Sequence, residues 1–258
     1  MSSLQRQSQI VEILQEKGRI SIPEMCKMFG ISDMTARRDL NEMDRLGLLR
    51  RIHGGAVANL GRSYEPPYQM RYTKNQSAKS CIGAKAAELI YDGDSIALDV
   101  GTTTLEIVKG LKGKRNLTIV TNSLQIANMV VDNLSLEINA RLILTGGVVR
   151  SQELSMIGNM SERAYQEFHV DKAFIGIGGI SLEDGLTEYN MEDARIKRIL
   201  FSSAREKIVV ADGSKFGITT FASVASLKSV DKIVTDPEVS LEVIEKIRNL
   251  GVEVIIAN

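Results

Sequence analysis

Apolar residues near the start of the chain recur at the three- and four-residue spacing of an α-helix. This pattern predicts a first helix over residues 4–17 and a second between Ser21 and Gly30. Ser21 and Glu24 have the spacing of a capping box, in which each side chain accepts a hydrogen bond from the other residue's backbone amide. The predicted buried side of the second helix consists of Met25, Met28 and Phe29, with Cys26 beside them.

A third helix is predicted to begin directly after Ser32, whose hydroxyl can cap the amides of the first turn. One side of this helix is apolar, with residues at positions i, i+4 and i+7, namely Ala36, Leu40 and Met43. Residues 48–51 then form an extended segment, and residues 53–55, His-Gly-Gly, form a tight turn. The whole stretch is therefore predicted to be a helix followed by a short basic hairpin.

Polar and basic side chains cover the rest of the third helix and the hairpin. They can donate hydrogen bonds to phosphates and to base edges, which predicts the recognition helix and wing of a winged helix-turn-helix domain that binds double-stranded DNA. The candidate DNA contacts are Ser32, Thr35, Arg37, Arg38 and Asn41 on the helix, and Arg50, Arg51 and His53 on the hairpin. The helix alone leaves open an arginine face that contacts only solvent. Because one such module touches few bases, we expect a homodimer or a homotetramer.

The remainder of the chain changes character twice. We expect a DNA-binding domain over residues 1–58, a linker over residues 59–79, where Pro66 and Pro67 exclude helix, and an α/β domain over residues 80–258. In the last segment apolar strands alternate with amphipathic helices, which indicates a largely parallel sheet with both faces covered. The predicted strands span residues 95–100, 117–120, 136–144, 172–177, 208–211, 232–234 and 252–256.

Small polar residues directly follow four of these strands. In a parallel sheet the carboxyl ends of the strands lie at one edge, where ligands bind. Residues 101–104, Gly-Thr-Thr-Thr, lead into a helix, and the amides and hydroxyls at a helix N-terminus can hold a phosphate. Lys215 follows a further strand and can supply a countercharge. The candidate ligand-binding residues at these strand ends are Gly101, Thr102, Thr103, Thr104, Thr121, Asn122, Gly146, Gly147, Gly176, Gly178 and Lys215.

Three acids and one amide are candidates for binding the hydroxyls of a sugar. They are Asp99, Asn122, Glu188 and Asp193. Taken singly, each acid is equally consistent with a surface charge, Asn122 with a turn, and the threonine loop with an ordinary helix cap. Their gathering at one sheet edge is what favours a binding site.

Charge is divided unevenly along the chain, although the formal net charge is zero. Residues 1–79 carry 13 Lys and Arg against 8 Asp and Glu, whereas residues 80–258 carry 19 against 24. A basic domain joined to an acidic one fits DNA contact at one end only, because phosphate neutralisation is local.

The composition narrows the class of protein further. Cys26 and Cys81 match no metal-ligand spacing, and two histidines offer little to a metal or histidine-based catalytic site, so we expect no metal and no cofactor. No apolar run is long enough to cross a bilayer, and the N-terminus has no signal-peptide pattern. These features predict a cytoplasmic protein with reduced thiols and no membrane partner.

Seven motifs, in order, resemble those of one known family. They are the helix-turn-helix and hairpin of residues 19–56, DVGTTT, VTNS, LTGG, FIGIGGI, GLTEYNMEDARIKR and ADGSKFG. In this order and spacing the chain resembles the DeoR family of bacterial sugar-metabolism transcriptional regulators over almost its whole length. The resemblance implies a winged helix that binds operator DNA and a C-terminal α/β domain, similar to ribose-5-phosphate isomerase, that senses a phosphorylated sugar.

The same resemblance implies roles for individual residues. Residues 101–104 would hold the phosphate, residues 185–197 would shape sugar specificity, and the rest of the pocket would come from Thr121, Asn122, Gly146, Gly147 and Lys215. We therefore expect a transcriptional repressor of a sugar or amino-sugar operon, whose affinity for its operator changes when a sugar phosphate binds.

Two other classes of protein remain open. An isomerase or deaminase-like enzyme would need a base and an acid at the strand ends, where residues 176–179 carry neither, although Glu188 or Asp193 could serve. We assign no catalytic residue. A protein-interaction module would bind its partner with little salt dependence, whereas contacts to DNA phosphates impose a steep one.

Overall fold

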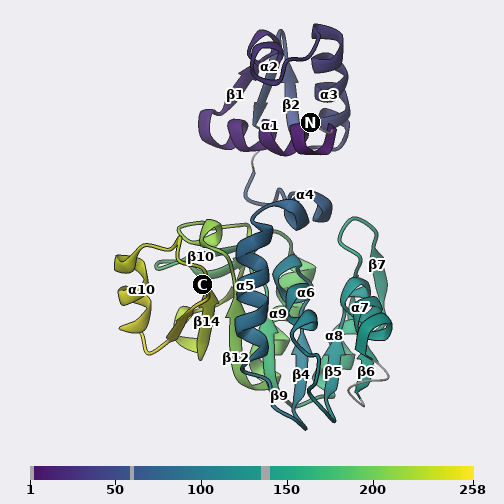
Figure 1. Ribbon diagram of the computed structural model, residues 1–258, viewed down its shortest axis with the longest axis vertical. Coiled ribbons are helices and arrows are strands. Elements are labelled where there is room, and N and C mark those ends of the chain that lie inside the picture. Colours follow the sequence, from purple (N-terminus) through teal and green to yellow (C-terminus); the bar gives the residue numbers. More distant parts are fainter. Residues whose placement is uncertain (1–2, 59–60, 135–139) are drawn as a thin grey trace. The chain divides into compact units, whose positions relative to one another are not determined.

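The computed structural model describes residues 3–58, 61–134 and 140–258. The chain divides into two compact units, Met1–Pro66 and Pro67–Asn258 (Figure 1). Each unit buries a hydrophobic core of its own.

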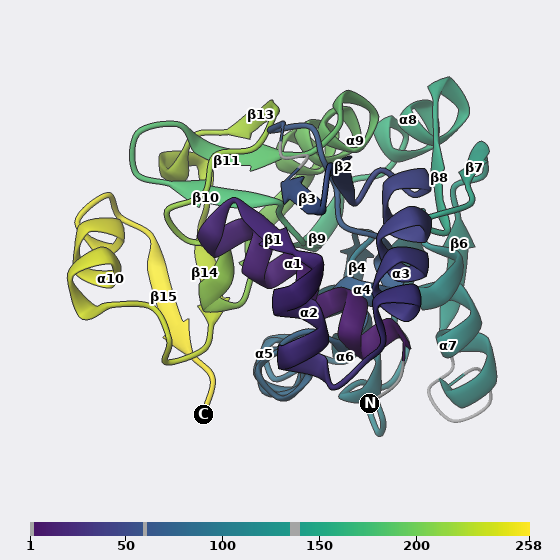
Figure 2. The ribbon, with the colours of Figure 1, turned by 90° about the horizontal axis from the view of Figure 1, so that it is seen from above.

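The first unit combines helices with a three-stranded antiparallel sheet in the order β1-β3-β2 (Figure 2). Its elements are α1 (Ser3–Lys17), β1 (Arg19–Ser21), α2 (Ile22–Phe29), α3 (Asp33–Arg45), β2 (Leu49–Ile52) and β3 (Gly55–Ala58). A Cβ on Gly55 would lie 2.2 Å from the carbonyl oxygen of Ile20, so glycine is needed where β3 approaches β1. Two helices joined by a short turn and followed by a hairpin confirm the predicted winged helix-turn-helix.

The helix starts are fixed by the side chains that the sequence indicated. Ser21 and Glu24 form the capping box, and the Ser32 hydroxyl accepts a hydrogen bond from the Thr35 amide at 3.3 Å. The predicted apolar stripe of α3 is fully buried. The expectation for Met28 was wrong, because its side chain is 51% exposed. Position 28 lies off the side of α2 that buries Ile22 and Met25, while Cys26 and Phe29 are half-buried.

A buried ion pair joins α1 to the core side of α3. The Arg6 guanidinium donates to both carboxylate oxygens of Asp39, with Nε–Oδ2 at 2.6 Å and Nη2–Oδ1 at 3.1 Å. The side chain of Arg6 is 9% exposed and that of Asp39 is 2% exposed. This two-point contact fixes the position of the predicted recognition helix in the unit.

The second unit is built on a seven-stranded sheet in the order β15-β14-β12-β9-β4-β5-β6, and every neighbouring pair is parallel. Its strands are β4 (Ser95–Leu98), β5 (Thr118–Thr121), β6 (Arg141–Leu144), β9 (Val170–Ile175), β12 (Ala204–Val210), β14 (Lys232–Thr235) and β15 (Glu253–Ile256). Each overlaps one predicted strand, which confirms the parallel α/β architecture. Residues 136–139 of the third predicted strand lie outside the described residues.

Helices cover both faces of this sheet. Three helices lie on one face, namely α5 (Gln76–Ala87), α6 (Thr102–Lys109) and α7 (Leu124–Leu134), and two on the other, α8 (Asn159–Gln166) and α9 (Met191–Ser203). Ile96 and Leu98 of β4 pack with the first group, whereas Ala97 packs with the second. Since successive strand residues point to opposite faces, the two groups of helices lie on opposite sides. The last helix of the chain is α10 (Leu241–Arg248).

Several short elements were not predicted, because three or four residues show no readable period. They are the hairpin of β7 (Val148–Arg150) and β8 (Ser155–Ile157), the antiparallel sheet of β10 (Gly179–Ser181), β11 (Gly185–Glu188) and β13 (Ala222–Ala225), and the 3₁₀ helices η1 (Gly213–Lys215) and η2 (Leu227–Ser229). Figure 2 shows the small sheet in the order β10-β11-β13. The hairpin and η1 both follow strands of the main sheet, so they border its carboxyl edge.

The linker is shorter than the sequence indicated. Helix α4 (Tyr68–Thr73) begins directly after Pro66 and Pro67, and α5 begins at Gln76. Residues 67–79 therefore belong to the second unit. The two prolines exclude helix only up to their own position, and Pro67 serves as the N-cap of α4.

Candidate functional sites

Helix α3 presents an ordered polar face. At its start the hydroxyls of Ser32 and Thr35 lie 3.0 Å apart and share a hydrogen bond. Arg37 pairs with Asp33 one turn earlier, through Nε–Oδ1 at 2.5 Å. Arg38 is exposed, and its side chain has no hydrogen bond or ion pair to any residue that the structure describes. Arg38 is thus a positive charge directed at solvent from the predicted recognition helix.

The hairpin is tied to α3 by two of the predicted contact residues. Arg51 is half-buried, and its Nη1 donates to the side-chain oxygen of Asn41 at 2.5 Å. The Arg51 backbone amide donates to Asp44 Oδ1 at 3.0 Å. By contrast, Arg50 and His53 are exposed. The structure therefore bonds Asn41 and Arg51 to each other and leaves Arg50 and His53 at the surface of the hairpin.

In the second unit the predicted phosphate loop, residues 101–104, forms the N-terminus of α6. Gly101 is the N-cap and provides no side chain, so the amides of the first turn have no side-chain cap. Thr102 and Thr103 are 5% and 8% exposed, and Thr104 is fully buried. Thr104 Oγ1 donates to the Gly101 carbonyl at 3.0 Å, so its hydroxyl closes the loop.

The next strand end is committed to hydrogen bonds within the protein. Thr121 Oγ1 donates to the Leu98 carbonyl at 2.7 Å. Asn122 Nδ2 donates to the Met156 carbonyl at 3.1 Å, and its Oδ1 accepts from the Tyr165 hydroxyl at 3.2 Å. Both residues are fully buried. Their side chains hold the strand ends together.

The remaining strand ends border the same edge of the sheet. Gly146 and Gly147 follow β6 and lead into the hairpin of β7 and β8. The Gly176 amide donates to Asp99 Oδ2 at 3.2 Å. Lys215 ends η1 after β12, with its Nζ 5.7 Å from the centre of the Tyr189 ring. A Cβ on Gly178 would lie 2.8 Å from Glu188 Oε1, so glycine permits that carboxylate to approach.

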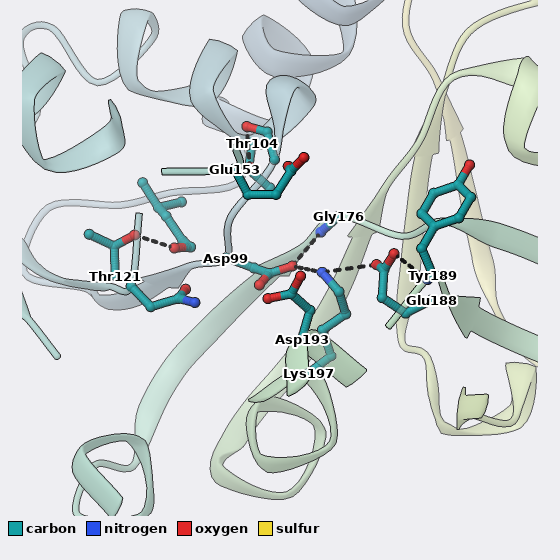
Figure 3. A network of polar contacts seen from close by, with 12 residues as sticks. Asp99, Thr104, Thr121, Glu153, Gly176, Glu188, Tyr189, Asp193 and Lys197 are labelled. Carbon is teal, nitrogen blue, oxygen red and sulfur yellow. Dashed lines mark hydrogen bonds and ion pairs between the residues drawn. The ribbon is translucent and has the colours of Figure 1, made fainter. Parts of the chain in front are cut away.

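The predicted acids converge on a lysine that the sequence did not single out (Figure 3). Lys197 of α9 is 2% exposed, and its Nζ pairs with Asp99 Oδ2 and lies 3.3 Å from Glu188 Oε2. Asp193, one turn earlier on α9, pairs with Arg150 and accepts from Asn190 Nδ2 at 2.8 Å. Helical spacing of four residues between Asp193 and Lys197 is the sequence signal that points to this group.

Burial and charge set the protonation of this cluster. Although burial by itself lowers the pKa of Lys197, the carboxylates of Asp99, Glu188 and Asp193 raise that pKa above its ordinary value, so the lysine stays charged. Burial raises the pKa of Asp99 to about 6. The ammonium of Lys197 lowers this pKa, and the carboxylates of Asp193 and Glu188 raise it further. The cluster thus holds one ammonium among three carboxylates.

Two oxygens of the cluster lack hydrogen-bond partners. Asp99 Oδ1 and Asp193 Oδ1 are buried and accept no hydrogen bond within the described part of the chain. Buried acceptors of this kind suit donors such as sugar hydroxyls. Across residues 3–58, 61–134 and 140–258, no group of His, Cys, Asp and Glu side chains is arranged to hold a metal ion.

Comparison with known proteins finds two family models that match this chain, one within each unit. Residues 6–60 match the model of the DeoR-like helix-turn-helix domain, and residues 74–237 match that of the DeoR C terminal sensor domain. No helix in the described residues is long and apolar enough to cross a membrane.

Two curated relatives match over nearly their whole lengths. The glycerol-3-phosphate regulon repressor of Escherichia coli K12 is 34% identical over 93% of this chain and 94% of its own. The transcriptional repressor AccR of Agrobacterium fabrum is 35% identical over 91% of this chain and 90% of its own. Among solved structures, ribose 5-phosphate isomerase A of Methanocaldococcus jannaschii matches 55% of each chain at 18% identity, with a TM-score of 0.40.

Proposed function

Because this chain belongs to the DeoR family of transcriptional regulators, we propose that it represses a sugar or amino-sugar operon and that a phosphorylated sugar changes its affinity for the operator. The relatives are named as regulators and repressors, so the chain is a DNA-binding regulator and not an enzyme. One edge of the main sheet supports the proposal. The N-terminus of α6 without a side-chain cap, Lys215 and buried carboxylates all border this edge, and the same chain has a winged helix.

The effector site has a phosphate end and a sugar end. The amides at the start of α6, from Gly101 to Thr104, and the hydroxyls of Thr102 and Thr103 bind the phosphate together with Lys215. The acceptors Asp99 Oδ1 and Asp193 Oδ1 bind hydroxyl or amino groups of the sugar. The other residues assigned to this site, which form its walls, are Thr121, Asn122, Gly146, Gly147, Gly176, Gly178 and Glu188.

The DNA-binding surface is the exposed side of α3 with the tip of the hairpin. Arg38 is its main charged contact, with Arg37 beside it, Ser32 and Thr35 at the helix start, and Arg50 and His53 on the wing. Asn41 and Arg51 hold the wing against the helix. Two or more such modules act together on repeated half-sites, as a homodimer or a homotetramer.

A ligand screen followed by DNA-binding measurements tests this proposal. Pentose 5-phosphates and hexose 6-phosphates, amino sugars included, are added during thermal melting, because a compound bound only by the folded protein raises Tm. Each hit is then added to gel shifts with a duplex that the wild-type protein has selected from a random pool. We expect at least one hit that also changes DNA affinity. If the wild-type protein binds none of these compounds and selects no duplex, both effector binding and operator binding are contradicted.

Replacing Arg38 with alanine is expected to weaken DNA binding without unfolding the chain. The loss should be about 1–3 kcal/mol, or roughly 5- to 150-fold in Kd, since one charged contact is removed from an exposed position. Gel shifts at several salt concentrations measure it. If Arg38 contacts a phosphate, its loss also reduces the dependence of log Kd on log salt concentration by about one. If Arg38 contacts a base, its loss relaxes the sequence preference instead.

The matched control for Arg38 is Arg141→Ala, which removes an exposed arginine from the second unit. Its affinity should equal that of the wild-type protein. Equal affinity of the Arg38 variant, with an unchanged melting curve, would rule out the proposed role.

Replacing Lys215 with alanine is expected to remove the response to the effector and spare DNA binding. A charge-assisted hydrogen bond is worth about 1.5–3 kcal/mol, so the Kd for the sugar phosphate should rise roughly 10- to 150-fold. Titration calorimetry measures this, with Lys228→Ala, an exposed lysine, as the control. If the Lys215 variant binds the compound as tightly as the control, the phosphate lies elsewhere.

A further inference from the structure

Helix α4 is the first element of the second unit. It begins at Tyr68, directly after the division between the units at Pro66 and Pro67. Any rearrangement of the second unit that displaces α4 therefore moves the point at which the chain leaves for the DNA-binding unit. The contacts that hold α4 decide what can displace it.

The first contact joins α4 to the hairpin of β7 and β8. Arg71 pairs with Glu153, which lies between the two strands and is 3% exposed. The same hairpin carries Arg150, which pairs with Asp193 of the buried cluster. Within the hairpin, the Glu153 backbone amide donates to the Arg150 carbonyl at 3.1 Å. Two ion pairs joined by this backbone hydrogen bond thus connect the sugar end of the proposed effector site to α4.

The second contact joins the corner between α4 and α5 to the loop of Lys215. Asn75, held at φ 52°, donates from Nδ2 to Asp212 Oδ1 at 2.9 Å. Asp212 is the N-cap of η1, which ends at Lys215. The buried Lys79 Nζ closes the corner by donating to the carbonyls of Arg71 and Lys74. One side-chain hydrogen bond therefore joins the start of η1, the element that carries Lys215, to the corner that follows α4.

We propose that α4 transmits effector binding to the DNA-binding unit, with Arg71 and Glu153 as the link to the sugar end and Asn75 as the link to the phosphate end. This rests on the proposed function, because it needs a ligand at that site. A ligand shifts an equilibrium only by its differential affinity for two arrangements. Here the ligand would favour one position of the hairpin and of η1, and the two links would impose the matching position on α4.

The test separates effector binding from its consequence. The double variant Arg71→Gln with Glu153→Gln removes both charges of this ion pair together, so neither charge is left buried without the other. The compound used is the tightest binder among pentose 5-phosphates and hexose 6-phosphates. We expect the double variant to bind this compound with the Kd of the wild-type protein. In the absence of the compound, the DNA affinity of the double variant should also equal that of the wild-type protein. The compound should change DNA affinity by about 5- to 150-fold in the wild-type protein and by close to one-fold in the double variant.

Further variants keep the outcome informative. Arg71→Lys keeps the ion pair and should retain the response of DNA affinity to the compound. Gln69→Ala changes an exposed residue of α4 and should leave this response unchanged. Asn75→Ala tests the second link independently and should reduce the response. A full response in the double variant, or a loss of its affinity for the compound, overturns the proposal. Failure of the wild-type protein to bind any of the compounds overturns the proposed function instead.

Discussion

Asp39→Ala is expected to unfold the first unit or bring it close to unfolding. Arg6 and Asp39 are both buried, and removal of the carboxylate leaves the guanidinium without its partner. Breaking a buried pair from one side costs about 3–5 kcal/mol, which is a large part of the stability of a small domain. Urea denaturation followed by amide hydrogen exchange in residues 3–58 measures the loss, and DNA affinity should fall with it.

A double variant separates the charge effect from simple loss of packing. Arg6→Met with Asp39→Leu replaces the pair by apolar side chains, and such replacements are often neutral or stabilising. We expect the double variant to recover most of the lost stability. If Asp39→Ala alone melts like the wild-type protein, the pair does not hold α1 against α3.

Lys197→Met is expected to destabilise the second unit to a similar degree, by about 3–5 kcal/mol at neutral pH. Its ammonium lies among Asp99, Glu188 and Asp193 in the interior, and methionine leaves those carboxylates facing one another. Thermal melting, with hydrogen exchange in residues 140–258, locates the loss. The variant should also lose its affinity for sugar phosphates, since the carboxylates would no longer be held in place.

The Lys197 variant should be least impaired in mild acid. Burial places the pKa of Asp99 at about 6, above its ordinary value of 3.8, so the folded protein takes up a proton there while the unfolded chain does not. The contribution of Asp99 to stability therefore rises as pH falls through about 6, and it falls as pH rises. Without the ammonium, which lowers the pKa of Asp99, that pKa shifts further upward. The difference in Tm between variant and wild type should thus be larger at pH 8 than at pH 5, and an equal difference would contradict this account.

Local features were the ones that the sequence could predict. Ser21, Glu24 and Ser32 act on amides within three residues of themselves, so their caps are readable from spacing alone. The parallel sheet was predictable because buried strands between amphipathic helices are apolar throughout. Helix α4 was missed because six residues of mixed polarity show no period. Met28 was misplaced because an eight-residue helix has only a narrow buried side.

Contacts between distant residues were beyond reach. Arg6 and Asp39 are 33 positions apart, and Lys197 and Asp99 are 98 positions apart. Nothing in the sequence distinguishes these charges from exposed ones, because burial depends on how the elements pack. For the same reason the hydrogen bond between Asn41 and Arg51, two of the predicted DNA contacts, could not be read from the sequence.

That bond between α3 and the hairpin has a consequence for engineering. Exchange of the recognition helix alone between related repressors would leave Arg51 facing a foreign side chain at position 41, and the hairpin would lose its anchor. The unit to transplant is residues 32–58, helix and wing together. Chimeric regulators with altered operator choice should be cut at the boundaries of that segment.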